Sequence, residues 1–305
     1  MRIYIDARYL GQDHVQQLQS RFVHHDFFFD PDYVETAEVI IAMPGIFLKH
    51  GLKDMKHLRF VQLLMAGFDR FDLDLAHRLG IKVANAQDVF STTIAEDILT
   101  KIFFFNRHVS HYLQAMKTHE WLPIPKEREL MGATFGFVGA GSIATTTAQR
   151  LKPFSVKLIA YRREKRNHPL FDEIYWGAEG LDALLRQSDY VIVAIPLTSE
   201  TAHLLDRRRL LLMKNDALLI NVSRGMIIDQ EALIDMLREK RIRGAALDVV
   251  TPEPLPESSS LWELDNVYIT PHNASSSTLM QSRLTALVEK NLKRLDLGED
   301  PFYLI

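Results

Sequence analysis

Short apolar runs alternate with longer segments of helical periodicity along the 305 residues of the chain. This alternation is typical of strand and helix units wound around a parallel sheet. In the first part of the chain, the apolar runs predict strands at Ile3–Ile5, Val39–Ala42, Phe60–Leu64 and Lys82–Ala84. The helical segments include Asp13–Arg21, Asp74–Leu79 with Gly80 as a C-terminal cap, and one long helix over 92–118. That last helix is long enough to join two domains.

The middle of the chain is more regular. Its apolar runs predict six further strands at Phe135–Val138, Lys157–Tyr161, Val191–Ile195, Leu218–Val222, Ala245–Leu247 and Val267–Ile269. Nearly continuous apolar runs are expected for strands that helices cover on both faces. A doubly wound parallel sheet binds its ligands beyond the carboxyl ends of its strands. The residues that follow the six strands are Gly139, Arg162, Pro196, Ser223-Arg224, Asp248 and Pro271-His272, so we expect the site there.

Composition narrows the class of protein. Hydrophobic residues make up 47% of the chain and charged residues 25%, with a net charge of −3. This balance is that of a folded globule and provides no overall attraction to nucleic acid or to an anionic membrane. The absence of cysteine excludes a disulfide framework, thiolate zinc sites and a cysteine nucleophile. Asp6 and Arg8 interrupt the apolar run that a signal peptide needs, so a cytoplasmic protein is expected.

A glycine-rich turn follows the strand Phe135–Val138 and reads G-x-G-x-x-A from Gly139 to Ala144. In a dinucleotide-binding turn, Gly139 would permit the tight bend and Gly141 would let the backbone approach the pyrophosphate. The next helix, which opens with Ser142 and Ile143, would direct its N–H groups and positive dipole end at the phosphates. Many α/β proteins carry such a turn without binding a dinucleotide, but its position between a buried strand and an amphipathic helix favours a cofactor site.

The strand Lys157–Tyr161 ends in Arg162-Arg163-Glu164-Lys165-Arg166, where an NAD-binding unit usually carries an acidic residue for the ribose hydroxyls. An arginine cannot accept hydrogen bonds from the ribose, but it can pair with a 2′-phosphate and stack on adenine. Arg162 and Arg163 therefore predict that NADP(H) is favoured over NAD(H). The alternative is an ordinary solvated loop of charged residues.

Three further segments stand out: Asn221-Val222-Ser223-Arg224-Gly225, Asp248 to Pro256 around Glu253, and Thr270-Pro271-His272-Asn273-Ala274-Ser275. Together with the glycine turn they resemble the D-isomer-specific 2-hydroxyacid dehydrogenase family. The chain also resembles this family in Phe60 to Asp69, Ile94-Ala95-Glu96 and Leu184 to Thr201, so the resemblance covers nearly all of it. Glyoxylate/hydroxypyruvate reductase-like members are the nearest in pattern. Gln87-Asp88, where many members have Pro-Gly, and Ser155, in place of a usual Gly, depart from it.

The reduction of a 2-oxo acid explains why these residue types are needed. Negative charge grows on the carbonyl oxygen as a hydride reaches the carbon, so the oxygen needs a proton and a cationic neighbour. Among Arg224, Glu253 and His272, only the histidine has a side chain that ordinarily titrates near neutrality. His272 is therefore the natural acid/base. The resemblance implies that Glu253 orients this imidazole and favours its protonated form. It also implies that Arg224 binds the carboxylate and the carbonyl oxygen. Taken singly, each residue could be an ordinary loop residue.

The resemblance also implies the remaining contacts. The backbone N–H groups of Ala66 and Gly67, beside Met65, match the turn that holds the substrate carboxylate. Pro196 and Ser223 are expected beside the cofactor. Asp248 matches a residue near the nicotinamide carboxamide, although an aspartate that caps a turn is a serious alternative. No metal site is expected, because His108 and His111 lie three apart on a helix without an evident third ligand.

The expected architecture follows from the resemblance and the periodicity together. Residues 1–97 and 276–305 would form a substrate domain, and 98–275 a dinucleotide-binding domain. Both would be Rossmann-like or flavodoxin-like doubly wound parallel sheets, with hinges near Asp97 and Ser275 and an active-site cleft between them. A homodimer through the cofactor domain is the default. Two alternatives are a nicotinamide-sensing protein of the same fold with little turnover, and another two-domain dehydrogenase that acts on formate or an amino acid.

Overall fold

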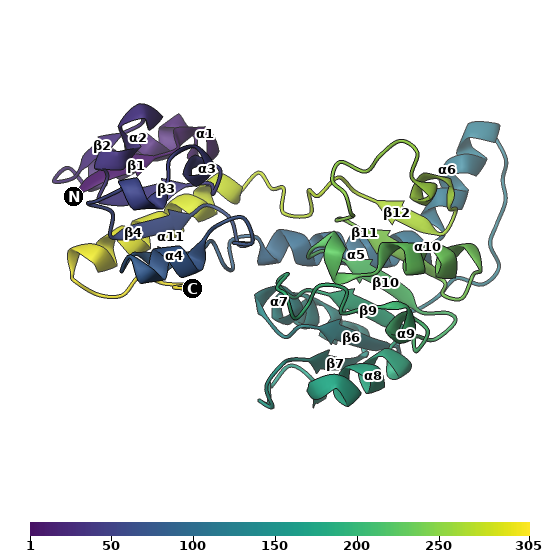
Figure 1. The fold of residues 1–305 in the computed structure, drawn as a ribbon. Coiled ribbons are helices and arrows are strands. Elements are labelled where there is room, and N and C mark those ends of the chain that lie inside the picture. The colour runs from purple at the N-terminus through teal and green to yellow at the C-terminus, as the bar shows by residue number, and fades with distance from the viewer. The chain divides into compact units, whose positions relative to one another are not determined.

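The computed structural model describes residues 1–305 as two compact units (Figure 1). The first unit contains Met1–Phe90 and Ser276–Ile305, and the second contains Ser91–Ser275. Each unit is built around a parallel sheet of its own. The α/β class and the pair of parallel-sheet domains predicted from the sequence are therefore confirmed.

The sheet of the first unit has the strand order β2-β1-β3-β4-β5, and all of its pairs are parallel. Its strands are β1 (Arg2–Ile5), β2 (Asp26–Phe28), β3 (Val39–Ala42), β4 (Phe60–Leu63) and β5 (Lys82–Ala84). The sequence predicts four of them. It misses β2, a three-residue edge strand, because a run of three phenylalanines is equally consistent with a strand, a core turn or an interface.

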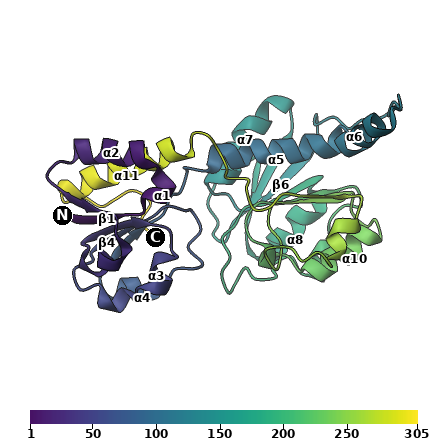
Figure 2. The ribbon, with the colours of Figure 1, turned by 90° about the horizontal axis from the view of Figure 1, so that it is seen from above.

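Helices cover both faces of this sheet (Figure 2). Alternate residues of β1 explain why: Ile3 and Ile5 belong to one apolar cluster, whereas Tyr4 belongs to another on the opposite face. The first cluster contains side chains of α1 (Ala7–Leu10), α2 (Gln12–Arg21) and α11 (Met280–Asp296). The second contains side chains of α4 (Leu73–Arg78), and α3 (Ile46–Lys49) packs against it.

The second unit has a seven-stranded parallel sheet of order β12-β11-β10-β9-β6-β7-β8. Its strands are β6 (Thr134–Val138), β7 (Lys157–Tyr161), β8 (Glu173–Tyr175), β9 (Tyr190–Val193), β10 (Leu218–Asn221), β11 (Gly244–Leu247) and β12 (Val267–Ile269). The sequence predicts all but β8, a short edge strand with little apolar character. Because β6 pairs with β7 on one side and β9 on the other, the chain reverses its winding direction at β6, where such sheets bind ligands.

The helices of the second unit also lie on both faces of its sheet (Figure 2). On one face are α5 (Ser91–Asn106) and α7 (Ser142–Leu151). The other face is covered by α8 (Gly177–Gln187), α9 (Arg207–Leu210) and α10 (Gln230–Arg238). Short 3-10 turns occur in both units, at η1 (Pro31–Thr36), η2 (Leu52–Asp54), η3 (Lys152–Phe154), η4 (Gly225–Ile227) and η5 (Ser260–Glu263).

The prediction of one long helix over 92–118 is wrong. The segment forms α5 and then α6 (Val109–Thr118), because His108 adopts a left-handed conformation with a φ of +46°. The last residue of α5, Asn106, is buried, and its side-chain oxygen accepts hydrogen bonds from Tyr190 and Arg243. These tertiary contacts fix the end of α5. The apolar periodicity of the sequence continues past Asn106, so it does not predict the break.

No helix of the structure combines the length and the apolar character required to span a membrane.

Candidate active site

The predicted site residues of the second unit gather at the carboxyl ends of neighbouring strands. Gly139 follows β6, Ser223 and Arg224 follow β10, Asp248 and Glu253 follow β11, and His272 follows β12. Since these strands are parallel and belong to one sheet, the loops after them emerge at the same edge. The edge thus carries a glycine turn, a cation, two carboxylates and an imidazole.

Gly139 makes the sharp turn that separates β6 from α7. Its φ is +112°, and a Cβ at this position would collide with the carbonyl oxygen of Ala194. The N–H group of Gly139 donates to the carbonyl of Tyr161 at 2.9 Å, which ties the turn to the neighbouring strand. Only glycine satisfies both the backbone angle and the close approach.

Beyond the turn, the start of α7 is open. Gly141 is the N-cap, and no side chain caps the first N–H groups of this ten-residue helix, which begins with Ser142 and Ile143. A Cβ at Gly141 would meet no atom within 4 Å. Uncapped N–H groups at the positive end of the helix dipole and an unfilled space beside them suit a pyrophosphate. The residues present therefore fit a dinucleotide.

The loop after β7 places no acidic side chain at the position of Arg162. The Arg162 backbone N–H donates to Tyr175 of β8 at 3.0 Å, and its guanidinium reaches only the carbonyl oxygen of Arg166, at 3.4 Å. The exposed Arg163 forms a 3.4 Å ion pair with Glu200. Arg162 is thus held at its backbone, and its guanidinium has no anionic partner within this loop.

The loop after β9 is held in shape by two threonines. The Thr201 hydroxyl donates to the carbonyl of Pro196 at 2.7 Å and accepts the N–H of Thr198 at 2.7 Å. Pro196 itself offers only a backbone carbonyl and an apolar ring, so its contribution here is to the course of the loop.

Arg224 lies in a loop that the Asn221 side chain holds from within. The Asn221 amide oxygen accepts the backbone N–H of Ser223 at 3.1 Å and its hydroxyl at 2.9 Å, and the amide nitrogen donates to the carbonyl of Arg224 at 3.0 Å. The next residue, Gly225, cannot carry a Cβ because that atom would collide with the carbonyl of Val250. The backbone of Arg224 is therefore fixed between β10 and the loop after β11.

His272 and Glu253 form a direct pair. The Nδ1 atom of His272 lies 2.8 Å from Oε2 of Glu253, and the other carboxylate oxygen accepts the N–H of Val250 at 3.3 Å. The two side chains are 43% and 31% exposed, so solutes can reach both. A carboxylate at Nδ1 requires the proton there, which leaves Nε2 as the atom that exchanges a proton.

The backbone of His272 is strained. Its φ is +51°, a value that residues other than glycine seldom adopt. Two hydrogen bonds maintain it, because the His272 N–H points at the carbonyls of Asp248, at 2.8 Å, and Thr270, at 2.9 Å. A left-handed residue held in this way re-aims its side chain at the edge of the sheet, and such strain is frequent at functional sites.

Asp248 holds the loop after β12 through its carboxylate. It is buried, and its carboxylate accepts the Thr270 hydroxyl at 2.7 Å and the N–H groups of Asn273 and Ala274 at 3.1 Å each. These are the contacts of an aspartate that caps a turn, the alternative that the sequence leaves open for this position. They also hold the loop on which His272 lies.

Sequence reasoning missed a buried ion pair behind Asp248. Lys101 of α5 is completely buried, forms an ion pair with Asp97, and donates to the Thr270 hydroxyl at 3.0 Å. Burial raises the pKa of the Asp97 carboxyl above its ordinary range, although the hydrogen bond from Lys101 opposes this. The sequence did contain a signal for this ion pair, because Asp97 and Lys101 are four residues apart within an otherwise apolar stripe of a helix.

The predicted substrate turn lies in the first unit, after β4. The carbonyls of Met65 and Ala66 accept hydrogen bonds from the Ala86 N–H, at 3.0 Å, and from the Asn85 side chain, at 2.7 Å. All three residues of the turn, Met65, Ala66 and Gly67, are half-buried. The carbonyl side of the turn is therefore anchored to the segment after β5, and its N–H groups face away from that anchor.

The chain is similar to known proteins in both sequence and fold. The family described as "D-isomer specific 2-hydroxyacid dehydrogenase, NAD binding domain" matches residues 99–274. A glyoxylate reductase of Thermofilum pendens is 36% identical over 286 residues, which are 88% of this chain and 77% of that protein. A D-isomer specific 2-hydroxyacid dehydrogenase family protein of Aeromonas salmonicida has a similar structure, with a TM-score of 0.88, 27% identity and coverage of 100% and 98%.

A second solved structure is similar to this chain as well. It is a D-isomer specific 2-hydroxyacid dehydrogenase of Xanthobacter autotrophicus, described in complex with NADPH and MES. The TM-score is 0.83 and the identity 26%, and the alignment covers 100% of this chain and 97% of that one.

Proposed function

Because the chain belongs to the D-isomer specific 2-hydroxyacid dehydrogenase family, and is thus an NAD(P)-dependent oxidoreductase of small 2-oxo and 2-hydroxy acids, we propose that it reduces glyoxylate or hydroxypyruvate with NADP(H) as the favoured cofactor. The observation that carries this proposal is the 2.8 Å contact between His272 and Glu253 at the end of β12. A reductase needs a proton donor beside the carbonyl oxygen, and an imidazole held by a carboxylate supplies one.

The chemistry of the reaction assigns a role to each residue. The nicotinamide cofactor, when bound, supplies or accepts the hydride at the substrate carbon. His272 gives the proton on Nε2 to the carbonyl oxygen in reduction and takes it back in oxidation. Glu253 holds Nδ1 and stabilises the charged imidazole. Arg224 binds the carboxylate and the carbonyl oxygen, where negative charge develops as the carbon is reduced.

We assign carboxylate binding also to the turn Met65-Ala66-Gly67. Support comes from the anchoring of its carbonyls, which leaves the N–H groups of Ala66 and Gly67 as donors. Two adjacent backbone N–H groups form a concave anion site, and a glycine lets the anion approach closely. Replacing Gly67 with a larger residue would raise KM for the acid by a larger factor than it raises the Kd of the cofactor.

For the cofactor, we assign the pyrophosphate to Gly139, Gly141, Ser142 and Ile143, and the 2′-phosphate to Arg162 and Arg163. The open start of α7 supports the first assignment, and the absence of an acid at the end of β7 supports the second. Pro196, Ser223 and Asp248 would line the remainder of the cofactor, where Asp248 acts mainly through the loop that it caps.

The proposed activity is tested with a substrate panel. The purified chain is mixed with glyoxylate, hydroxypyruvate, pyruvate or phenylpyruvate, and the loss of reduced nicotinamide absorbance is followed with NADPH and, separately, with NADH. We expect the highest kcat/KM for glyoxylate or hydroxypyruvate with NADPH. Equal kcat/KM with NADH and NADPH would contradict the cofactor preference, and a preference for larger acids would contradict the substrate.

A nicotinamide-sensing protein is the main alternative. Such a protein needs the turn at Gly139 but no proton donor. The pairing of His272 with Glu253 favours the enzyme, because a sensor has no use for an imidazole that a left-handed backbone and a carboxylate hold in place. Tight NADPH binding without turnover of any acid in the panel would favour the sensor.

We also propose that the chain forms a homodimer through the second unit. The helix α6 extends past the end of that unit's sheet (Figure 2). It and the segment after it carry large apolar side chains that water reaches, namely Leu113, Met116, Trp121 and Leu122. Trp121 is 97% exposed. Apolar side chains grouped in this way usually mark an interface, and a symmetric dimer is the commonest assembly.

A further inference from the structure

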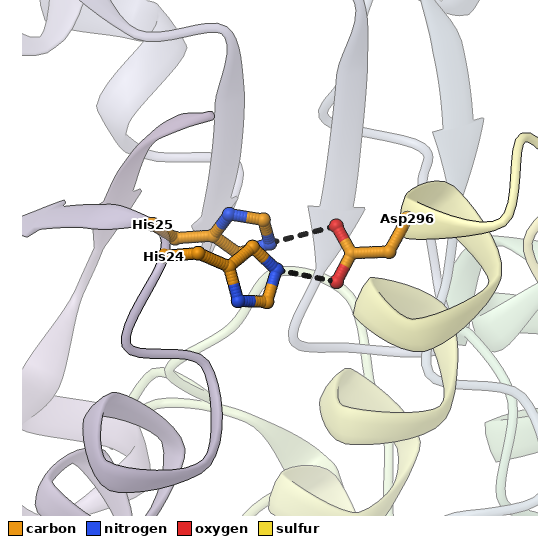
Figure 3. Close-up of side chains that lie close together, drawn as sticks. All are labelled: His24, His25 and Asp296. Atoms are coloured by element: carbon orange, nitrogen blue, oxygen red, sulfur yellow. Dashed lines mark hydrogen bonds and ion pairs between the residues drawn. The ribbon is translucent and has the colours of Figure 1, made fainter.

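Two adjacent histidines and an aspartate come together in the first unit (Figure 3). They lie on helices and turns that contribute nothing to the proposed active site. His24 and His25 occupy the turn between α2 and β2, and Asp296 is the last residue of α11. The Nε2 atom of His24 lies 2.9 Å from one oxygen of the Asp296 carboxylate, and Nε2 of His25 lies 3.0 Å from the other. His24 and Asp296 are 272 positions apart in the sequence.

The His25 ring is held in place. Its side chain is 2% exposed, and the ring stacks on Phe22 with centroids 5.9 Å apart and planes 5° from parallel. The Nε2 atom points toward Asp296 (Figure 3), yet it makes no hydrogen bond. This nitrogen is buried and close to a carboxylate, but the geometry of the contact is not that of a hydrogen bond. Its hydrogen-bonding capacity is therefore unsatisfied, which is rare for a buried polar atom.

A metal ion would satisfy this nitrogen. We propose that His24 Nε2, His25 Nε2 and the Asp296 carboxylate bind a divalent transition metal ion, of which Zn²⁺ is the best match. Imidazole nitrogen and carboxylate oxygen are common zinc ligands, at about 2.0–2.2 Å from the ion. The three ligand atoms lie within 4.8 Å of one another, which a single ion can bridge after small side-chain adjustments.

The surroundings favour a cation at this place. Asp296 ends α11, so the ion would lie at the negative end of the helix dipole. The exposed side of His24 leaves room for water as a further ligand, because 59% of that side chain is in solvent.

The competing explanation is a purely structural histidine cluster. The Nδ1 atom of His25 lies 3.3 Å from the amino group of Met1, which would donate to it and place a proton on Nε2. In that arrangement the Nε2–H groups of both histidines face the Asp296 carboxylate as donors and no ion binds. The metal-bound arrangement instead ties α11 to the turn before β2, so an ion would raise the stability of the first unit.

The experiment uses the full-length chain without an affinity tag, stripped of metal with a chelator. Zn²⁺ binding is measured by calorimetry, the unfolding temperature is measured with and without Zn²⁺, and Co²⁺ serves as a probe of ligand geometry through its visible absorption. His24→Ala and Asp296→Asn remove one ligand each. His57→Ala, an exposed histidine of the same unit, is the matched control.

We expect one Zn²⁺ per chain, a higher unfolding temperature with Zn²⁺, and a visible Co²⁺ spectrum for the unmodified chain and for His57→Ala. His24→Ala and Asp296→Asn should fold but bind Zn²⁺ at least about tenfold more weakly, since loss of even an outer-shell partner has that effect. Equal Zn²⁺ affinity in the ligand and control variants, or no saturable binding by the unmodified chain, would overturn the proposal.

Discussion

The imidazole of His272 and the carboxylate of Glu253 meet at 2.8 Å although the two residues lie 19 positions apart and on loops after different strands. Both loops depend on neighbours: Asp248 holds the backbone of His272, and Gln230 accepts the N–H of Thr251 at 2.8 Å near Glu253. The pair that we propose as the proton donor and its partner is thus positioned by the loops after β11 and β12 together.

Replacing either member of this pair should reduce turnover by different amounts. His272→Gln removes the proton donor, so we expect kcat to fall by about 10²–10⁴, the range of general acid catalysis. Glu253→Gln keeps a hydrogen-bond acceptor but loses the charge, and we expect a fall of about 10–100-fold. Steady-state kinetics with glyoxylate, together with NADPH affinity measured by fluorescence, would check this. Unchanged kcat in His272→Gln would contradict the assigned role, and weakened NADPH binding would point to misfolding instead.

The cofactor preference should depend on Arg162. In Arg162→Glu the pairing with the 2′-phosphate is lost and a carboxylate can accept from the ribose, so KM for NADPH should rise by about 10–100-fold. KM for NADH should fall or stay the same. Arg186→Glu, which makes the same charge change on the exposed side of α8, serves as the control and should leave both constants unchanged. If both variants behave alike, a general charge effect would explain the result better than a specific contact.

The two glycines of the turn should respond differently to alanine. Gly139→Ala puts a Cβ against the carbonyl of Ala194 at a φ of +112°, so the unfolding temperature should fall even without cofactor. Gly141→Ala meets open space, so its unfolding temperature should be unchanged while NADPH affinity drops. Thermal unfolding with and without NADPH separates the two. A Gly141→Ala chain that binds NADPH normally would argue against a pyrophosphate at this place.

Stability at low pH should depend on Glu289 of α11. The hydrogen bond from Lys293, at 2.7 Å, and the ion pair with Arg21 of α2 hold the pKa of this carboxyl below its ordinary value of 4.5. A lowered pKa in the folded protein means that these contacts stabilise it above pH 4.5 and that the contribution is lost as the pH falls below that value.

Glu289→Gln should therefore lower the free energy of unfolding by about 1 kcal/mol near neutral pH. The difference from the unmodified chain should shrink as the pH falls below about 4.5, which thermal unfolding at a series of pH values would measure. Glu35→Gln, at a mainly exposed side chain of the same unit, is the control. A difference that persists at low pH would mean that packing, and not charge, is lost.

The oligomeric state should depend on the apolar surface around α6. Changing Met116 and Trp121 to Asp together would put charge into the proposed interface, so the dimer should dissociate into monomers. Light scattering after size exclusion gives the mass directly. A single change of the exposed Leu297 to Asp, in the first unit, is the matched control and should leave the mass unchanged. A monomeric unmodified chain would end the proposal.

Much of the fold and of the site could be read from local patterns. The largely buried strands β3 and β7 have the bounds that their apolar runs predict, because the core selects the same residues that the sequence marks. The segment after β6 was recognisable as a tight turn from its glycines, of which Gly139 has a φ of +112° that other residues seldom adopt. The three-residue edge strands β2 and β8 were not, because each begins with an acidic residue and has only two apolar positions, too few to form a pattern.

By itself, then, the sequence determined the two-sheet α/β architecture and the order of the residues that follow the strands, among them Arg224, Glu253 and His272. Only the tertiary structure decided the break at His108, the burial of Lys101 beside Asp97, and the meeting of His24 and His25 with Asp296. The physical reason is the range of the interactions. Periodicity and turn propensity act within a few residues, whereas polar groups are paired across hundreds of residues by contacts that form once the chain has packed.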